Sequence, residues 1–326
     1  MRMILRADCE TWAFAARARA YHKYRPSDYQ ITIAYGDEQP PGPFDACFFL
    51  DAHTSREPYP GVPVCRLIAS HAWLYPRQDP DDWRTRGVNK FRNSDRVGTI
   101  VHDSDVLAVY NQAQYEFFTK RHSKVVLCPY TVDRQIFEQC DRPYRERLRV
   151  GWAFQVNGGL NSFKGLADIV VPLAAKLGDV VEWCVITPDA TTSLTPHQLA
   201  SFYKTCDIFL CTSSGEGGPQ GPFEAASTGC VVVGTDVGQL SDWSALRELE
   251  LVAPVYRNAT EAKETVYWMA CAIEGLIDDR EFLTEARHRL ADSIRNNYDA
   301  SVECPKQLRA IVAAMPEKVV EDGHLC

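Results

Sequence analysis

The sequence predicts an α/β protein made of two Rossmann-like domains. At 326 residues the chain is roughly twice the length of a typical domain. Short apolar or β-branched runs alternate with amphipathic segments along its whole length, which indicates mainly parallel sheets. A charged, proline-containing stretch at residues 138–149 divides this alternation into two series. We therefore expect an N-terminal domain at 1–138, a C-terminal domain at 146–299, and a last helix, about 300–326, packing back on the first.

The first series reads as strands with helices between them. Strands are expected at residues 1–7, 30–35, 44–51, 62–70, 96–101 and 124–129, and helices within 8–26 and 106–122. Pro26 ends the first helix. No G-x-G-x-x-G fingerprint follows the first strand, so a nicotinamide or flavin cofactor is not expected there.

The second series repeats this alternation. Strands are expected at residues 148–154, 180–187, 207–211, 230–235 and 249–254, with helices at 163–177, 195–206, 260–278, 279–298 and 303–316 and a short one ending at Gly229. Ligands of parallel α/β sheets bind beyond the carboxyl ends of the strands, so the loops at those ends are the candidate sites.

Composition restricts the class of protein. Asp and Glu number 43 against 35 Lys and Arg, and the net charge of −8 argues against a broad nucleic-acid-binding surface. The 12 cysteines form no C-x-x-C pair and lie mostly in apolar runs, as buried reduced thiols do. The sequence shows no signal peptide and no run near the roughly 20 apolar residues of a membrane span. We expect a cytoplasmic protein without a transmembrane segment.

The segment SSGEGGPQGPFEAASTGCVVVGTDVG, residues 213–238, is the strongest candidate site. Glu216 and Glu224 flank a glycine- and proline-rich loop that leads into a helix. Glycines allow the backbone to approach a ligand closely, and a helix N-terminus presents unpaired N–H groups to anionic or hydroxyl oxygens. The alternative interpretation is an acidic surface loop with a carboxylate placed favourably near a helix start.

Three further residues follow strands of the two sheets. Lys164, in LNSFKGL, lies where the first strand of the second series turns into its helix, and it could reach a phosphate held there. The alternative is that the Lys164 side chain is simply exposed to solvent, as lysines at helix starts usually are. His53 and His71 follow strands of the first series, and capping or packing is the alternative for both.

No metal site is expected. The acidic clusters at residues 79–82 and 103–105 are interpreted as loop and helix-cap residues. No G-x-S-x-G, H-E-x-x-H or P-loop motif occurs.

Several motifs together resemble the GT-B, family-4 retaining glycosyltransferases. EGGPQGPFEAASTGCVVVGTDVG is similar to that family's E-x7-E segment, with Glu216 and Glu224 in the paired positions. The segments SFYKTCDIFLCTSS, FKGL, VVLCPYTVDRQIF and VLAVYNQAQYEFF resemble other family motifs in the right order, and together they cover most of residues 97–240.

The resemblance implies two Rossmann-like domains that face each other across a cleft, and it implies roles for particular residues. Glu216 would bind the hydroxyls of the donor sugar, Glu224 would bind the ribose, and Lys164 would neutralise the diphosphate leaving group. His71 would face the donor sugar from the first domain. The implied substrate is a UDP- or GDP-sugar, with no metal and no further cofactor, because a cation and helix dipoles stabilise the departing diphosphate.

The backbone around this donor is expected to contribute as well. Gly217, Gly218 and the helix start at Gly221 would hold sugar and phosphate. The family's phosphate-binding arginine has no counterpart upstream of Lys164, so Asn161, Ser162 or backbone N–H groups would replace it.

Other departures from the family pattern affect the donor loop and the linker. Pro219 and Pro222 lack N–H groups, and PYTVD stands in place of PNGVD.

The resemblance predicts transfer to an acceptor hydroxyl of a glycan or lipid-linked glycan. Modified, hydroxymethylated DNA bases are the alternative acceptor, and a sugar-nucleotide epimerase or a binding module is the alternative class. Basic residues of the first helix could contact an anionic membrane or DNA, although solvent is the default: Arg17, Arg19, Lys23 and Arg25.

Overall fold

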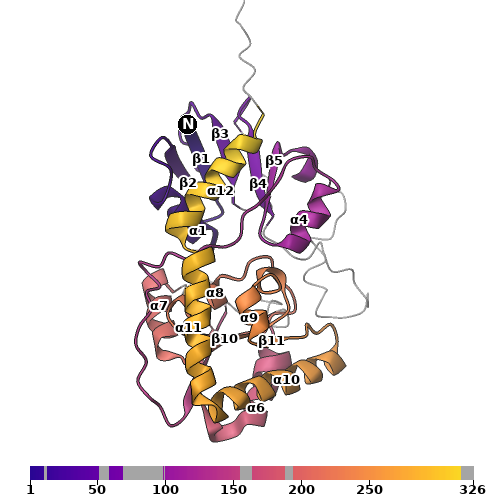
Figure 1. The fold of residues 1–326 in the computed structure, drawn as a ribbon. Helices are drawn as coiled ribbons and strands as arrows, with labels where there is room; N and C mark the ends of the chain where they lie inside the picture. The colour runs from indigo at the N-terminus through magenta and orange to yellow at the C-terminus, as the bar shows by residue number, and fades with distance from the viewer. Residues whose placement is uncertain are drawn as a thin grey trace, which may run out of the picture.

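The computed structural model describes residues 1–10, 13–50, 59–68, 98, 100–154, 164–187 and 194–316. Within these residues the chain forms two parallel sheets, one above the other in Figure 1. We call each sheet with its helices a lobe.

The N-terminal lobe contains a six-stranded sheet in the order β2-β1-β3-β4-β5-β6. Its strands are β1 (Arg2–Ala7), β2 (Gln30–Tyr35), β3 (Ala46–Phe49), β4 (Val64–Ile68), β5 (Val106–Val109) and β6 (Val125–Leu127). Every pairing is parallel, and β3, β4 and β5 are buried throughout, as expected for a sheet covered on both faces. Among the described residues, the helices that pack on this lobe include α1 (Ala13–Lys23), α4 (Gln112–Thr119) and α12 (Ala300–Ala314).

The C-terminal lobe contains a five-stranded parallel sheet in the order β11-β10-β9-β7-β8. Its strands are β7 (Leu148–Ala153), β8 (Val181–Ile186), β9 (Ile208–Cys211), β10 (Val231–Thr235) and β11 (Val252–Ala253). Its helices are the π-helix η2 (Leu166–Val170), α6 (Val171–Leu177), the 3-10 helix η3 (Gly178–Val180), α7 (Pro196–Thr205), α8 (Gln220–Ser227), the 3-10 helix η4 (Gly238–Leu240), α9 (Ser244–Glu248), α10 (Ala259–Asp278) and α11 (Arg280–Asn297). The β-branched residues of β10 are fully buried, which explains why this run forms a central strand.

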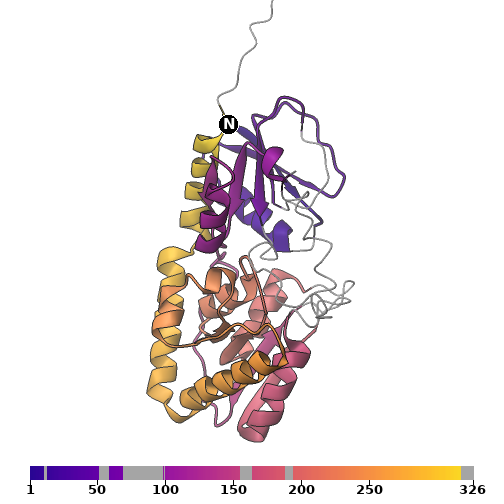
Figure 2. The ribbon, with the colours of Figure 1, turned by 90° about the vertical axis from the view of Figure 1, so that its right-hand side faces the viewer.

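The last helix returns to the N-terminal lobe. Helix α11 runs along the C-terminal lobe and α12 continues upward against α1, β5 and β6 (Figures 1 and 2). Asp299 separates them and caps α12 by accepting a hydrogen bond from the Ser301 N–H at 2.9 Å. Residues beyond 316 lie outside the described part of the chain.

The sequence prediction was wrong at the fifth strand. Residues 96–101 were expected to form it, but Gly98 and the described residues 100–102 are helical. The fifth strand is Val106–Val109, which we had assigned to the following helix. A four-residue apolar run fits either structure, and tertiary packing decides between them. Ile100 packs with Leu107 and Val109 in one buried cluster, and Asn111 caps a helix that begins only at Gln112.

The connection between the lobes runs from residue 128 to residue 147, between β6 and β7. The expected boundary at 138–146 lies within it. Val132 fixes its first part, because the Val132 N–H donates to the Tyr298 carbonyl at 2.8 Å and the Ala300 N–H donates to the Val132 carbonyl at 2.9 Å. The chain therefore crosses between the lobes twice at the same place, once at Val132 and once at Asp299.

Candidate functional site

Lys164 and Glu216 form an ion pair in the structure, although 52 positions separate them in the sequence. Lys164 follows β7 and Glu216 follows β9, and β7 and β9 are neighbours in the sheet. Ser213 Oγ donates a hydrogen bond to the same carboxylate oxygen of Glu216 at 2.8 Å. The two charged side chains are only 20% and 12% exposed, so the pair is poorly solvated. Its position at the carboxyl edge of the sheet is where parallel α/β sheets bind ligands.

Thr212 stabilises the turn that carries Lys164 by hydrogen bonding. Thr212 Oγ1 donates to the Lys164 carbonyl at 2.7 Å and accepts from Trp152 Nε1 at 2.9 Å. Tyr256 donates its hydroxyl to the Thr212 carbonyl at 3.0 Å. Gly165 has φ of +78°, and a Cβ there would lie 2.2 Å from the Thr212 carbonyl oxygen. Only glycine fits this position, so the backbone of the Lys164 turn lies close against the end of β9.

Glu224 lies on α8 and is only 4% exposed. Tyr130 donates its hydroxyl to Glu224 Oε1 at 2.7 Å, and Tyr203 donates to Oε2 at 3.2 Å. Burial raises the pKa of Glu224 from 4.5 to about 7, and the two tyrosine hydrogen bonds offset part of that rise. Each carboxylate oxygen has two lone pairs, so the group can still accept hydrogen bonds from ligand hydroxyls.

A cavity of about 400 Å³ opens beside Glu224 between the lobes. It is lined by the body of α1, residues 130–137 of the connection, the start of α7, and Gln220 and Glu224 of α8. Its size is in the range of small-molecule sites. The sequence did not indicate Tyr130 or Tyr203 as partners of Glu224, although the tyrosine in PYTVD was a visible departure from the family pattern.

The glycine-rich loop after β9 is closely packed on both sides. A Cβ on Gly218 would lie 2.4 Å from the ring of Tyr110, at the end of β5 in the other lobe. The carboxyl edges of the two sheets therefore face each other at this point. At Gly221 a Cβ would approach both Phe209 and Tyr203 to 3.3 Å, which gives this glycine a packing role. Its expected contact with the donor stays a prediction.

Helix α8 has fewer backbone N–H groups in its first turn than an ordinary helix. Pro219 is the N-cap residue and Pro222 is the third residue of the helix. Neither has an N–H group, so Gln220 and Gly221 carry the N–H groups of the first turn. The departure noted in the sequence therefore reduces the anion-binding capacity of this helix.

Three expected site residues, His71, Asn161 and Ser162, lie outside the described residues, and so does His53. Their expected roles stay predictions.

Arg17 differs from what the basic pattern of the first helix suggested. We expected solvent, an anionic membrane or DNA as its environment, but its side chain is only 2% exposed. Its guanidinium donates to the Cys128 carbonyl at 2.8 Å and lies 4.6 Å from the ring centre of Tyr110. Arg17 lies on the face of α1 that packs against the connection between the lobes. The basic composition of the helix does not reveal which of its residues face that way. Arg19, Lys23 and Arg25 are exposed, as expected.

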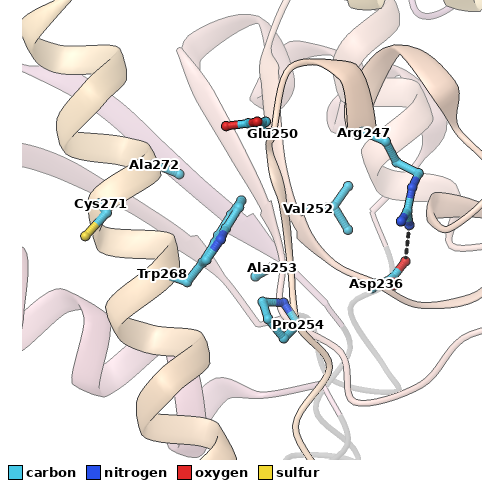
Figure 3. A pocket seen from close by; sticks show the side chains of 9 residues that line it. All are labelled: Asp236, Arg247, Glu250, Val252, Ala253, Pro254, Trp268, Cys271 and Ala272. Atoms are coloured by element: carbon cyan, nitrogen blue, oxygen red, sulfur yellow. Dashed lines mark hydrogen bonds and ion pairs between the residues drawn. The ribbon is translucent and has the colours of Figure 1, made fainter.

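A second hollow, of about 630 Å³, lies along the edge of the C-terminal sheet (Figure 3). Trp268 of α10 stands on one side, and the ion pair between Arg247 and Asp236, 2.8 Å apart, stands on the other. Strand β11 lies between them. None of the expected site residues lines this hollow.

The cysteines in the described part of the chain are free, and most of them are buried. In the same residues, no group of three or more His, Cys, Asp or Glu side chains is arranged to hold a metal ion. No helix among them is long and apolar enough to span a bilayer.

The fold is similar to those of several solved structures at low sequence identity. Sucrose-phosphate synthase from Thermosynechococcus elongatus is 11% identical, with a TM-score of 0.68 over 96% of this chain and 100% of that one. Anabaena Alr3699/HepE, solved in complex with UDP, is 9% identical, with a TM-score of 0.62 over 96% of this chain and 100% of that one. A glycosyltransferase from Rickettsia africae ESF-5 is 9% identical, with a TM-score of 0.60 over 96% and 98%.

No protein-family model and no curated protein matches the chain. The structural likenesses and the two parallel sheets confirm the expected GT-B fold.

Proposed function

We propose that the protein is a glycosyltransferase that moves a sugar from a UDP- or GDP-sugar to an acceptor hydroxyl. The observation that carries this proposal is the Lys164–Glu216 pair at the carboxyl edge of the C-terminal sheet, with the buried Glu224 eight residues further along. The Lys164 cation fits the diphosphate of a nucleotide sugar, and the Glu216 carboxylate fits its sugar hydroxyls. The Glu224 carboxylate, beside the cavity, fits its ribose. The GT-B fold, shared with the structures named above, supports the same activity.

Glu216 and Lys164 would act on the two ends of the bond that breaks. The Glu216 carboxylate accepts hydrogen bonds from the hydroxyls of the donor sugar and orients its anomeric carbon. As the bond to the diphosphate breaks, negative charge grows on the leaving oxygen, and the Lys164 ammonium stabilises it. Because both side chains are poorly solvated, this electrostatic stabilisation is stronger than it would be in water.

Glu224 and the cavity it lines would take the ribose. The two ribose hydroxyls would donate to the lone pairs of the Glu224 carboxylate that the hydrogen bonds from Tyr130 and Tyr203 leave unused. The hydroxyls donate best to an ionised carboxylate, so their binding favours loss of the Glu224 proton. Nucleotide affinity should consequently increase as the pH rises through 7.

Transfer is proposed to be retaining and metal-independent. The Lys164 ammonium would supply the positive charge that a metal ion supplies elsewhere. A leaving phosphate that stays on the face of attack can accept the proton of the incoming hydroxyl, which leads to retention. The proposed acceptor is a glycan or a lipid-linked glycan.

The test measures release of the nucleoside diphosphate from UDP- and GDP-sugars, with and without candidate acceptors. Glu216→Ala should abolish transfer and leave nucleoside diphosphate binding, measured by calorimetry, largely unchanged. Glu285→Ala, which removes an exposed carboxylate on α11, is the matched control and should retain activity. Full activity in Glu216→Ala would refute the assignment. Conversion of the donor without release of diphosphate would indicate an epimerase, and binding without turnover would indicate a binding module.

A further inference from the structure

We infer that Asn111 is a positioning residue through which the N-terminal lobe holds the Glu216–Gly218 loop of the C-terminal lobe. The donor-sugar carboxylate is then correctly placed only while the two lobes are together. The catalytic meaning of Glu216 rests on the proposed function, whereas the contact between the lobes does not.

Asn111 makes two hydrogen bonds that use opposite ends of its amide. Its Oδ1 accepts from the Gln114 N–H at 2.8 Å and caps α4. Its Nδ2 donates to the Gly217 carbonyl at 2.9 Å, in the other lobe. The orientation of the amide follows from chemistry, since an N–H group needs an acceptor and a carbonyl needs a donor. The side chain is only 1% exposed, so water does not readily replace either bond.

The Gly217 carbonyl is a junction between three segments. It accepts a second hydrogen bond, at 2.9 Å, from the N–H of Gln239. The Gln239 side chain in turn pairs with the backbone of Tyr130, accepting from its N–H at 2.7 Å and donating to its carbonyl at 3.2 Å. Both the turn after β5 and the connection between the lobes therefore reach the residue that directly follows Glu216.

The loop has little room to move between these contacts. Gly218 lies against the Tyr110 ring on one side, as described above. On the other side, a Cβ on Gly238 would lie 2.4 Å from the Gly217 carbonyl oxygen and 2.5 Å from that of Glu216. A further bond between the lobes, from the Gln112 N–H to Asp242 Oδ2 at 2.6 Å, runs beside them.

Separation of the lobes would break the Asn111 bond and leave the loop held only by contacts within its own lobe, from Gly238 and the Gln239 N–H. Small displacements of groups that orient a substrate reduce the rate of reaction strongly. Asn111 thereby makes assembly of the sugar-binding site depend on closure, which keeps the donor from reacting with water while the lobes are apart.

Asn111→Asp tests this inference, because Asp is as good an N-cap as Asn but places a carboxylate oxygen opposite the Gly217 carbonyl. We expect kcat to fall about 10- to 100-fold. The dissociation constant of UDP or GDP should change less than about twofold, since the lost interaction acts on turnover and not on nucleotide binding. The share of donor that is hydrolysed instead of transferred should rise. Asn111→Ser, which keeps a capping oxygen without adding charge, should change these quantities in the same direction.

Asn258→Asp is the matched control. Asn258 is exposed and caps α10 by accepting from the N–H groups of Thr260 and Glu261, within its own lobe. This variant should keep the kcat and the transfer-to-hydrolysis ratio of the wild type. Wild-type kcat in Asn111→Asp, or an equal loss of kcat in Asn258→Asp, would overturn the inference.

Small-angle scattering separates this inference from the proposed function. The radius of gyration should be larger in Asn111→Asp than in wild type and Asn258→Asp. If the wild type releases no nucleoside diphosphate from any UDP- or GDP-sugar, the proposed function fails, and the scattering comparison still decides the contact between the lobes. Identical scattering from all three proteins would overturn the inference.

Discussion

Glu224→Gln is expected to remove a large pH dependence from the stability of the protein. Burial raises the pKa of Glu224 from 4.5 to about 7. The folded state therefore binds this proton more tightly than the unfolded state does. Its contribution to stability is fully present below pH 4.5 and is lost as the pH rises to about 7.

The magnitude follows from the difference between the two pKa values. Each pKa unit corresponds to 1.36 kcal/mol, so the wild type should lose about 3 kcal/mol over this pH range through Glu224 alone. The glutamine variant keeps the shape of the side chain and a partner for each tyrosine hydroxyl, but it does not titrate. The difference in unfolding free energy between the variant and the wild type should thus rise by about 3 kcal/mol from pH 4.5 to pH 7 and then level off.

Urea unfolding at several pH values, followed by tryptophan fluorescence, measures this difference. Comparing two proteins that differ at one position cancels the titration of all other groups. Glu285→Gln, at an exposed position, should give a pH profile parallel to that of the wild type. A constant difference between Glu224→Gln and the wild type across the pH range would refute the interpretation of Glu224 as a buried, poorly solvated carboxyl group. If Glu224 binds ribose, saturating UDP or GDP should also stabilise the wild type more at pH 8 than at pH 6.

Three other predictions concern the donor site. Lys164→Gln should lower kcat about 100- to 1000-fold, because it removes a charge at the leaving diphosphate; a change confined to KM would contradict this role. Gly165→Ala should lower the free energy of unfolding by at least about 2 kcal/mol, since it combines a positive φ with a close backbone contact, and an unchanged denaturation midpoint would show that the Lys164 turn is adaptable. EDTA should leave initial rates of transfer unchanged, whereas a loss of activity restored by a divalent cation would refute metal independence.

Much of the architecture was visible in the sequence. The alternation of short apolar runs and amphipathic segments predicted two parallel α/β sheets. Glu216 and Lys164 were recognised as candidates at the carboxyl edge of one sheet, and the structure brings them into contact. Their proximity could be predicted because the loops that follow neighbouring parallel strands lie at the same, carboxyl edge of the sheet.

The errors share one cause. The run VLAV was assigned to a helix and residues 96–101 to a strand, because short apolar segments fit both structures. Arg17 was assigned to the surface, but it holds the connection between the lobes. In each case the deciding contact comes from a segment that is distant in sequence.

The sequence by itself determined the class of fold and indicated the two carboxylates and the lysine as candidate site residues, because local patterns and spacing encode strand ends and loops. Only the tertiary structure showed that Tyr130 and Tyr203 donate hydrogen bonds to Glu224 and that burial raises the pKa of this carboxyl group. It alone showed that Asn111 reaches Gly217 from the other lobe. Burial and hydrogen bonding between distant segments depend on how the two sheets are placed against each other, and no local pattern specifies that placement.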